Sequence, residues 1–258
     1  MQDRYKATWS DHQSNTWELI GSDWYAGIMA GGIEGLMGEV TDTVMTSPMV
    51  PGQVVDHQQI NPMTGTLRLG VRTHNGVSAE ETWAKFRQGF HHRFPGTLIL
   101  ETPGGPLTAR LRRNGVIPAP EEDPSSAGNS LRVEVPVISD DGCWWTEWEQ
   151  GSEIVTVTND GDIPIGVEIR WQGSGGVVTM PSGAEFTLPG VPGPRVLNLS
   201  PSGAIAVTHT NGVLDREFWK ILQRVAYPEG VAIGDTQQFR LPLGATLRWR
   251  KGVLDPWQ

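Results

Sequence analysis

The sequence contains very little cysteine and no long apolar run. Its 258 residues include a single cysteine, Cys143, which excludes an intrachain disulfide and a multi-cysteine zinc site. No segment approaches the roughly 18 consecutive apolar residues of a membrane-spanning helix. The polar residues 1–6 are followed by no apolar core of a signal peptide. We therefore expect a protein with no membrane partner that folds in a reducing compartment.

Basic residues are also scarce. Lysine and arginine number 20 against 29 acidic residues, which gives a net charge of −9. Sequence-specific binding of nucleic acid needs a basic face that displaces counterions, so we expect no such partner. The sequence has no Walker A or G-x-S-x-G motif, and Gly31, Gly32 and Gly35 do not have the dinucleotide-binding spacing. We expect no catalytic residue, no cofactor and no metal, and hence no enzyme.

Glycine and proline, by contrast, are abundant, with 32 and 19 residues. Such frequent turn formers favour many short strands over a helical bundle. Apolar and polar residues alternate, as in half-buried strands, at 65–73, 107–113, 131–137 and 165–171. Further short strands are expected at 98–100, 154–158, 177–179, 184–188, 195–199, 204–209, 237–241 and 246–250. The strands at 98–100 and 107–113 are expected to form a hairpin, and the predicted fold class is mainly β.

A helix is predicted over residues 79–92. Ser78 is a favourable N-cap, and Glu81 completes a capping box three residues later. One apolar face would contain Trp83, Phe86 and Phe90. A second helix is expected at 215–223. Residues 1–60, with the glycine-rich run 27–38, are expected to form short strands and loops.

Negative charge is concentrated in one acidic segment. Residues 119–148 contain seven acidic residues and one arginine, a net −6 of the total −9. The run 118–128, rich in proline, serine and acid, is typical of an exposed loop. Few core contacts should cross such a segment. We therefore predict two domains, residues 1–148, which include the acidic segment, and residues 149–258.

The candidate contact residues are Trp144, Trp145 and Trp148. Exposed indoles can stack on sugar rings, whereas indoles more often fill cores and subunit interfaces, and both interpretations stay open. Alternation along a strand would bury at least one of the first two. Nothing nearby in the sequence would lower the pKa of Cys143, so we interpret it as a buried or half-buried inert thiol. His91 and His92 would fall in the last turn of the predicted helix, where adjacent side chains diverge and cannot readily share a metal.

Several segments, in their order and spacing, resemble the distal tail and minor tail proteins of long-tailed bacteriophages, especially those of actinobacterial hosts. In the first half these segments are 51–53, 62–71, 78–87 and 95–98, and in the second half 157–171, 186–191 and 255–257. The resemblance covers residues 50–258 and rests on the whole pattern, which includes the turn sequence Asn-Asp-Gly-Asp at 159–162.

This resemblance implies a structural protein at the distal end of the phage tail in the virion, synthesised in the host cytoplasm. It implies an N-terminal β-barrel- or sandwich-like domain with one helix that forms a homo-oligomeric, hexameric ring. The C-terminal domain would be a galectin-like β-sandwich. The implied partners are the tail tube protein, the tape-measure protein and tail-tip, tail-associated lysin or fibre proteins, with DNA passing through the ring. The alternative is a carbohydrate-binding module or adhesin on the virion surface, which the tryptophans would serve.

Overall fold

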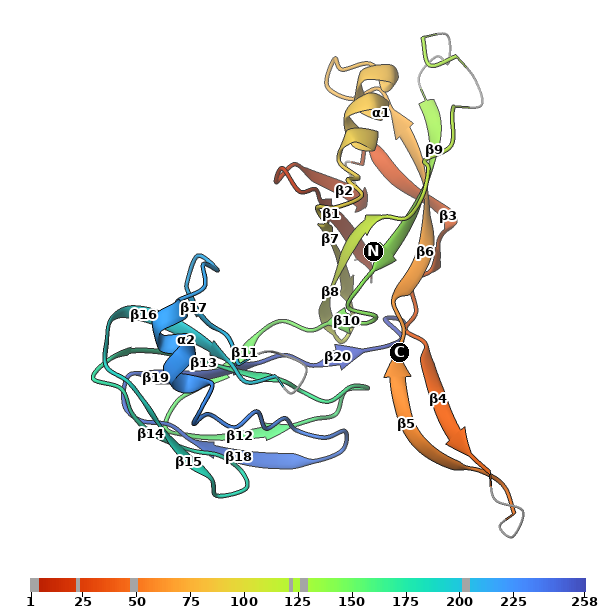
Figure 1. The fold of residues 1–258 in the computed structure, drawn as a ribbon. Coiled ribbons are helices and arrows are strands. Elements are labelled where there is room, and N and C mark those ends of the chain that lie inside the picture. Colours follow the sequence, from red (N-terminus) through yellow and green to blue (C-terminus); the bar gives the residue numbers. More distant parts are fainter. Residues whose placement is uncertain (1–4, 22–23, 47–50, 121–122, 126–129, 201–204) are drawn as a thin grey trace. The chain divides into compact units, whose positions relative to one another are not determined.

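Antiparallel strand pairs dominate the structure, which is a computed structural model drawn in Figure 1. It describes residues 5–21, 24–46, 51–120, 123–125, 130–200 and 205–258. The prediction of a mainly β fold is confirmed. The chain divides into two compact units, the first comprising Met1–Trp145 with Val253–Gln258 and the second Thr146–Gly252. Within the predicted loop at 118–128, residues 121–122 and 126–128 lie outside the described residues.

The first unit is built on one continuous path of hydrogen-bonded strands. In pairing order these are β2 (Thr16–Ile20), β1 (Lys6–Ser10), β7 (Gly96–Thr102), β8 (Gly105–Arg113), β9 (Ser130–Ser139), β6 (Met63–Arg72) and β3 (Ala26–Gly35). Two short strands, β10 (Trp144–Trp145) and β20 (Gly252–Val253), pair with each other, and β10 also pairs with β8. The hairpin predicted from 98–100 and 107–113 is present as β7 and β8.

The two ends of this path share one apolar core. Trp9 and Leu98, from β1 and β7, are fully buried in the same cluster as Leu67 and Val135, from β6 and β9. Strand β8 connects the two halves, because it pairs along its length with β7 and through its last two residues with β9. In β6 and β9, the alternating apolar residues therefore face this core, and the polar residues between them face away from it.

The helix α1 (Ala79–Gln88) begins as predicted and ends earlier. Ser78 accepts the backbone N–H of Glu81 at 3.1 Å and caps the first turn. The prediction of a helix to residue 92 is wrong, because Gly89 ends the helix with its N–H bonded to carbonyls of the preceding turn. The helix is therefore ten residues long.

The residues after α1 follow a different course from the predicted last turn. Phe90 stacks on Trp9, with ring centroids 4.5 Å apart, and is buried there. His91 Nδ1 accepts the backbone N–H groups of Arg93 and Phe94 at 3.0 and 3.1 Å. These contacts replace helical hydrogen bonds, so the histidine pair lies beyond the helix and the prediction that placed it in the last turn is wrong.

The described part of residues 1–60 forms short strands joined by loops, as predicted, and the glycine-rich run 27–38 belongs to this region. Most of this run lies in β3, a ten-residue strand that pairs with β6 and shifts register between Ile28 and Ile33. Glycine is needed in this bulge because a Cβ atom on Gly32 would collide with the carbonyl oxygen of Arg68. The glycines conceal the strand in the sequence, since they provide no alternating side chains.

The second unit is a β-sandwich, as predicted. One sheet has the order β11 (Glu149–Gly151), β19 (Ala245–Trp249), β13 (Val167–Gly173), β16 (Val191–Asn198) and β17 (Val207–His209). The other has the order β12 (Ile154–Thr158), β18 (Thr236–Arg240), β14 (Gly176–Thr179) and β15 (Glu185–Leu188). Buried side chains of both sheets form one cluster, and the predicted second helix is present as α2 (Arg216–Leu222).

The second unit begins at Thr146 and ends one residue after Lys251, and these two residues are hydrogen-bonded to each other. The backbone N–H of Thr146 donates to the carbonyl of Lys251, and the N–H of Lys251 donates to the Thr146 hydroxyl, both at 3.0 Å. The last six residues, Val253–Gln258, group with the first unit. There the rings of Tyr5 and Trp257 lie 5.7 Å apart. The division into domains 1–148 and 149–258 stays a prediction about folding.

A fragment of residues 146–252 is expected to fold alone, because both sheets and their shared core lie within it. Urea unfolding followed by circular dichroism should show one cooperative transition. A fragment of residues 149–258 is the comparison. It lacks Thr146 and carries six residues that group with the first unit, so we expect it to be less stable by about 1 kcal/mol. Absence of a cooperative transition in both fragments would show that the chain folds as a single domain.

Candidate assembly surfaces

The hairpin of β4 (Val40–Met45) and β5 (Val54–Ile60) is the most exposed element of the first unit. Its strands form a separate two-stranded sheet, and Figure 1 shows it extending away from the other strands of that unit. The exposed apolar side chains on it are Val40, Val44, Met45, Val54 and Val55. An isolated two-stranded hairpin is marginally stable in water. This hairpin is therefore a candidate surface for contact with another chain.

The base of the hairpin is held by buried polar contacts. Trp144 donates its indole N–H to the carbonyl of Leu36 at 2.7 Å, in a fully buried bond. Leu36 has a left-handed backbone, with φ of +56°, at the point where the chain leaves β3. Two residues later, the N–H of Gly38 donates to the carbonyl of Leu254 at 2.8 Å. The direction in which the hairpin leaves the sheet is thus set by residues from three separate parts of the first unit.

Sequence reasoning missed this hairpin as a site. A signal was present, because Pro51 and Gly52 lie between two runs that contain β-branched residues. The runs lack the alternation that marks a strand with one buried face, since both faces of β4 are exposed. A pattern search for half-buried strands therefore passes over it.

The three candidate tryptophans belong to different units. Trp144 is fully buried and Trp145 half-buried in the first unit, so the expectation that one of them would be buried is confirmed. Trp148 lies in the second unit and is 40% exposed. The guanidinium carbons of Arg248 and Arg250 lie 4.6 and 5.0 Å from its ring centroid. Contact of Trp145 or Trp148 with a neighbour or a sugar stays a prediction.

The cysteine and the histidines form no metal centre in the part of the chain that the structure describes. Cys143 is fully buried, as expected. The rings of His91 and His92 stack with centroids 4.5 Å apart, and the ring centroid of His12 lies 5.3 Å from that of His91. No group of three histidine, cysteine or acidic side chains among the described residues could hold a metal ion. None of the described helices is long and apolar enough to cross a membrane.

A cavity of about 550 Å³ lies between the β1–β2 turn, the segment 74–77 and one side of α1. Trp17, Tyr25 and His74 line it. The Tyr25 ring stacks on His74, with centroids 4.8 Å apart, and is tilted against the Trp17 ring at 5.1 Å. Its lining residues include one carboxylate, Asp11. That carboxylate accepts two backbone N–H groups and the Asn15 side-chain amide, at 2.8 to 2.9 Å. It therefore holds the β1–β2 turn in place.

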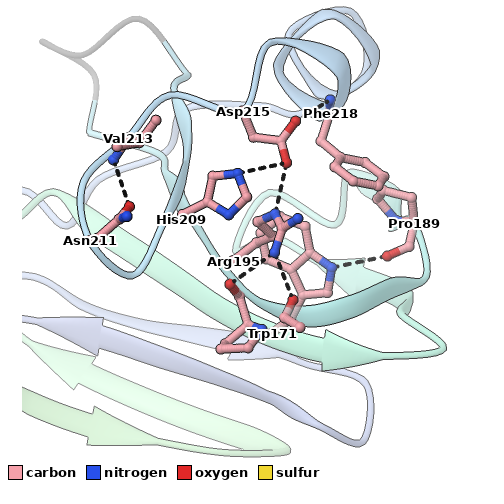
Figure 2. A network of polar contacts seen from close by, with 10 residues as sticks. Trp171, Pro189, Arg195, His209, Asn211, Val213, Asp215 and Phe218 are labelled. Carbon is pink, nitrogen blue, oxygen red and sulfur yellow. Dashed lines mark hydrogen bonds and ion pairs between the residues drawn. The ribbon is translucent and has the colours of Figure 1, made fainter.

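The second unit contains an ion pair that is almost removed from solvent. Arg195 donates Nε–H to Asp215 Oδ2 at 2.8 Å, and the two side chains are only 12% and 11% exposed. Asp215 Oδ1 also accepts the backbone N–H of Phe218 and caps α2. His209 Nε2 lies 3.5 Å from Oδ2. Figure 2 shows these groups converging on the single carboxylate, which fastens α2 to β16 and β17.

The Asp215 carboxylate has a pKa below its ordinary value. Burial acts to raise this pKa, but the hydrogen bond from Arg195, the N–H of Phe218 and the charges of Arg195 and His209 together lower it by more. A carboxyl group whose folded pKa is depressed stabilises the fold above its unfolded pKa of about 3.9. That stabilisation is lost as the pH falls through the lower folded value.

The sequence matches no protein-family model and no curated protein. Three of the solved structures that match nearly the whole chain come from the hub or baseplate of phages. One is SPP1 Dit, described as a paradigm of the hub adsorption apparatus in phages that infect Gram-positive bacteria. It has a TM-score of 0.62 and 11% identity, and the match covers 97% of this chain and 99% of that one.

Two further matches are structures of the phage p2 baseplate in its activated conformation, one with Sr and one with Ca. Each has a TM-score of 0.53 and 11% identity, over 96% of this chain and 97% of the other. At this identity the likeness is one of fold. The resemblance to distal tail proteins is confirmed at that level, while the actinobacterial host stays a prediction.

Replacement of Trp144 by phenylalanine should destabilise the first unit by about 1–3 kcal/mol, because the buried carbonyl of Leu36 loses its donor. Trp145→Phe is the matched control, since the Trp145 indole donates to the exposed carboxylate of Asp141. We expect this control to change stability by about 0.5 kcal/mol or less. Urea unfolding of the full chain measures both, and equal effects would contradict the assigned role of Trp144.

Asp215→Asn should destabilise the second unit by roughly 3 kcal/mol at neutral pH, because Arg195 loses its buried anion while asparagine can still cap α2. Glu217→Gln removes a charge from an exposed position in the same helix and should cost about 0.5 kcal/mol or less. Below about pH 4 the difference between wild type and Asp215→Asn should shrink as the wild-type carboxyl is protonated. Urea unfolding from neutral to acid pH tests this, and a difference that stays constant would refute the ion-pair explanation.

Proposed function

We propose that the protein is a structural subunit of the tail tip of a long-tailed phage, where copies of it form a ring that joins the tail tube to the adsorption apparatus. The observation that carries this proposal is the likeness to SPP1 Dit, which spans both units and nearly the full length of both chains. A β-sandwich alone occurs with many functions. A match that includes the first unit, the second unit and their order in the chain is far more specific.

The exposed β4–β5 hairpin supports ring formation. It presents Met45 and Val54, at 57% and 56% exposure, as a cross-strand pair. A hairpin that contacts a different surface of the next copy makes a head-to-tail contact, and such contacts close into a ring when the rotation between copies is right. Burial of the hairpin by a neighbour would remove its apolar side chains from water. We propose a hexamer closed in this way.

The ring would have the tail tube protein and the tape-measure protein on one side and tail-tip, tail-associated lysin or fibre proteins on the other. Its place would be the distal end of the tail in the virion, after synthesis in the host cytoplasm, with DNA passing through it. The role is structural and not enzymatic. In support, the carboxylate in the cavity beside α1 already holds a turn.

Carbohydrate binding by the second unit has less support. The exposed indole there is Trp148, and the guanidinium groups of Arg248 and Arg250 lie over its ring. A sugar that stacked on this indole would compete with both cation–π contacts. We therefore propose that the galectin-like sandwich of the second unit binds other tip proteins and not a sugar.

Native mass spectrometry of the purified protein should show a ring-sized oligomer of about six copies, and the double variant Met45→Asp/Val54→Asp should abolish it. The reason is that two carboxylates at this exposed pair would have to be buried in the neighbouring subunit. Thr41→Asp/Gln59→Asp introduces the same charges at a cross-strand pair nearer the hairpin base. This control should retain the oligomer.

Gold-labelled antibody on intact virions locates the protein independently of its oligomeric state. Label at the distal tail end is expected. Label on the capsid or along the whole tube would overturn the proposed function. If the Met45→Asp/Val54→Asp variant still forms a ring, the hairpin is not part of the assembly surface. The proposed location at the distal tail end would be unaffected by that result.

A further inference from the structure

A second hollow of about 550 Å³, on another side of α1, collects positive charge. Its lining includes Trp83, Arg87, Gln88, His91, His92 and Arg113. These residues come from α1, from the segment after it and from the end of β8. No acidic side chain is among the described residues that line it. This is unusual in a chain with nine more acidic than basic residues. We call this site the cationic hollow.

The described contacts that fix Arg87 in the cationic hollow all come from neutral groups. Its Nη1 and Nη2 atoms donate to the carbonyls of Pro118 and Ile117 at 2.6 and 3.3 Å. Its guanidinium carbon lies 4.4 Å from the centroid of the Trp83 ring. Carbonyls and an indole orient a guanidinium group without neutralising its charge, and no carboxylate among the described residues pairs with it. The positive charge is therefore held in one place, as preorganised binding sites require.

Arg113 faces the same hollow without a partner for its side chain in the described part of the chain. Its Nε atom is buried there with no acceptor, while its backbone N–H donates to the carbonyl of His91 at 3.1 Å. The preceding residue shows the contrast, because Arg112 donates Nε and Nη2 to the two carboxylate oxygens of Asp140, both at 2.7 Å. A buried donor with no acceptor destabilises a fold until a ligand supplies one.

The electrostatic surroundings of the hollow are positive throughout. Burial lowers the pKa of Arg87, and the charge of Arg113 lowers it further. The pKa of His91 is lowered by burial and then by four cationic or protonatable neighbours, His92, His12, Arg113 and Arg93. No acidic group contributes to either shift. An anion in the hollow would relieve repulsion among all of these groups.

We propose that the cationic hollow binds a carboxylate side chain presented by another polypeptide, with the carboxylate near Arg87 and Arg113 and the adjacent apolar part of the ligand against Trp83. Guanidinium groups match the two oxygens of a carboxylate. A nucleic-acid backbone would need a basic surface that follows successive phosphates, whereas here the charge is confined to one hollow on an acidic chain. This inference goes beyond the ring and does not depend on it.

The test titrates the full chain with a short peptide that contains two glutamates beside a leucine, and with a matched peptide that has glutamines instead. Isothermal calorimetry should show binding of the glutamate peptide and about tenfold weaker binding of the glutamine peptide. NMR of the imidazole groups should show the His91 pKa rising when the glutamate peptide binds, because an anion favours the charged ring. A purely structural role for the arginines would not produce that rise.

Variants locate the binding. Arg113→Gln should weaken the glutamate peptide about tenfold. Arg110→Gln, an equal charge change at an exposed position of β8, should change it about twofold or less. If Arg113→Gln does not fold, Arg113→Lys keeps the charge and should still weaken binding about threefold, because the planar fork is lost.

Three results would each overturn the proposal. The first is equal affinity for the two peptides, and the second is an affinity that neither Arg113 variant lowers. The third is tighter binding of an oligothymidylate or of inorganic phosphate than of the glutamate peptide, which would assign the cationic hollow to phosphate and not to a protein carboxylate.

Discussion

The buried bond from the Trp144 indole to the carbonyl of Leu36 sets the geometry on which the assembly surface depends. A buried indole N–H needs an acceptor, and this acceptor lies 108 residues earlier in the chain. The carbonyl belongs to the residue whose left-handed backbone directs the chain out of β3 and toward the hairpin. The bond therefore ties together distant parts of the first unit at the point where the chain turns toward the hairpin.

The two units differ in how far they satisfy their own buried polar groups. In the second unit, Arg195 and Asp215 pair with each other, and a cluster from both sheets fills the core. In the first unit, the buried indole nitrogens of Trp9 and Trp17 and the Nε atom of Arg113 have no acceptor among the described residues. The hairpin that we propose as an assembly surface and the cationic hollow both lie in this first unit.

The sequence predicted those parts of the fold that local chemistry decides. Strands with one buried face show alternation, and α1 starts where the Ser78 hydroxyl accepts the backbone N–H of Glu81. Just after the end of α1, Phe90 stacks on Trp9. This contact joins distant segments of the chain, so the helical spacing of apolar residues in the sequence could not predict it. The candidate sites were harder to predict from the sequence. The hairpin is exposed on both faces, and the cationic hollow forms where α1 and the end of β8 come together, and both are properties of the folded chain. The resemblance over residues 50–258, which rests on the order and spacing of several segments, identified the fold where single motifs were absent.

The paired backbone bonds between Thr146 and Lys251 have an architectural consequence. Because the chain enters and leaves the second unit at bonded neighbours and then completes the first unit with its last six residues, the sandwich is a nested insert and not an appended tail. An inserted domain whose two ends lie side by side can be replaced by another without changing the path of the chain in the surrounding domain. In the ring proposed above, exchange of the second unit at this single junction would leave the first unit, and with it the geometry of the ring, unchanged.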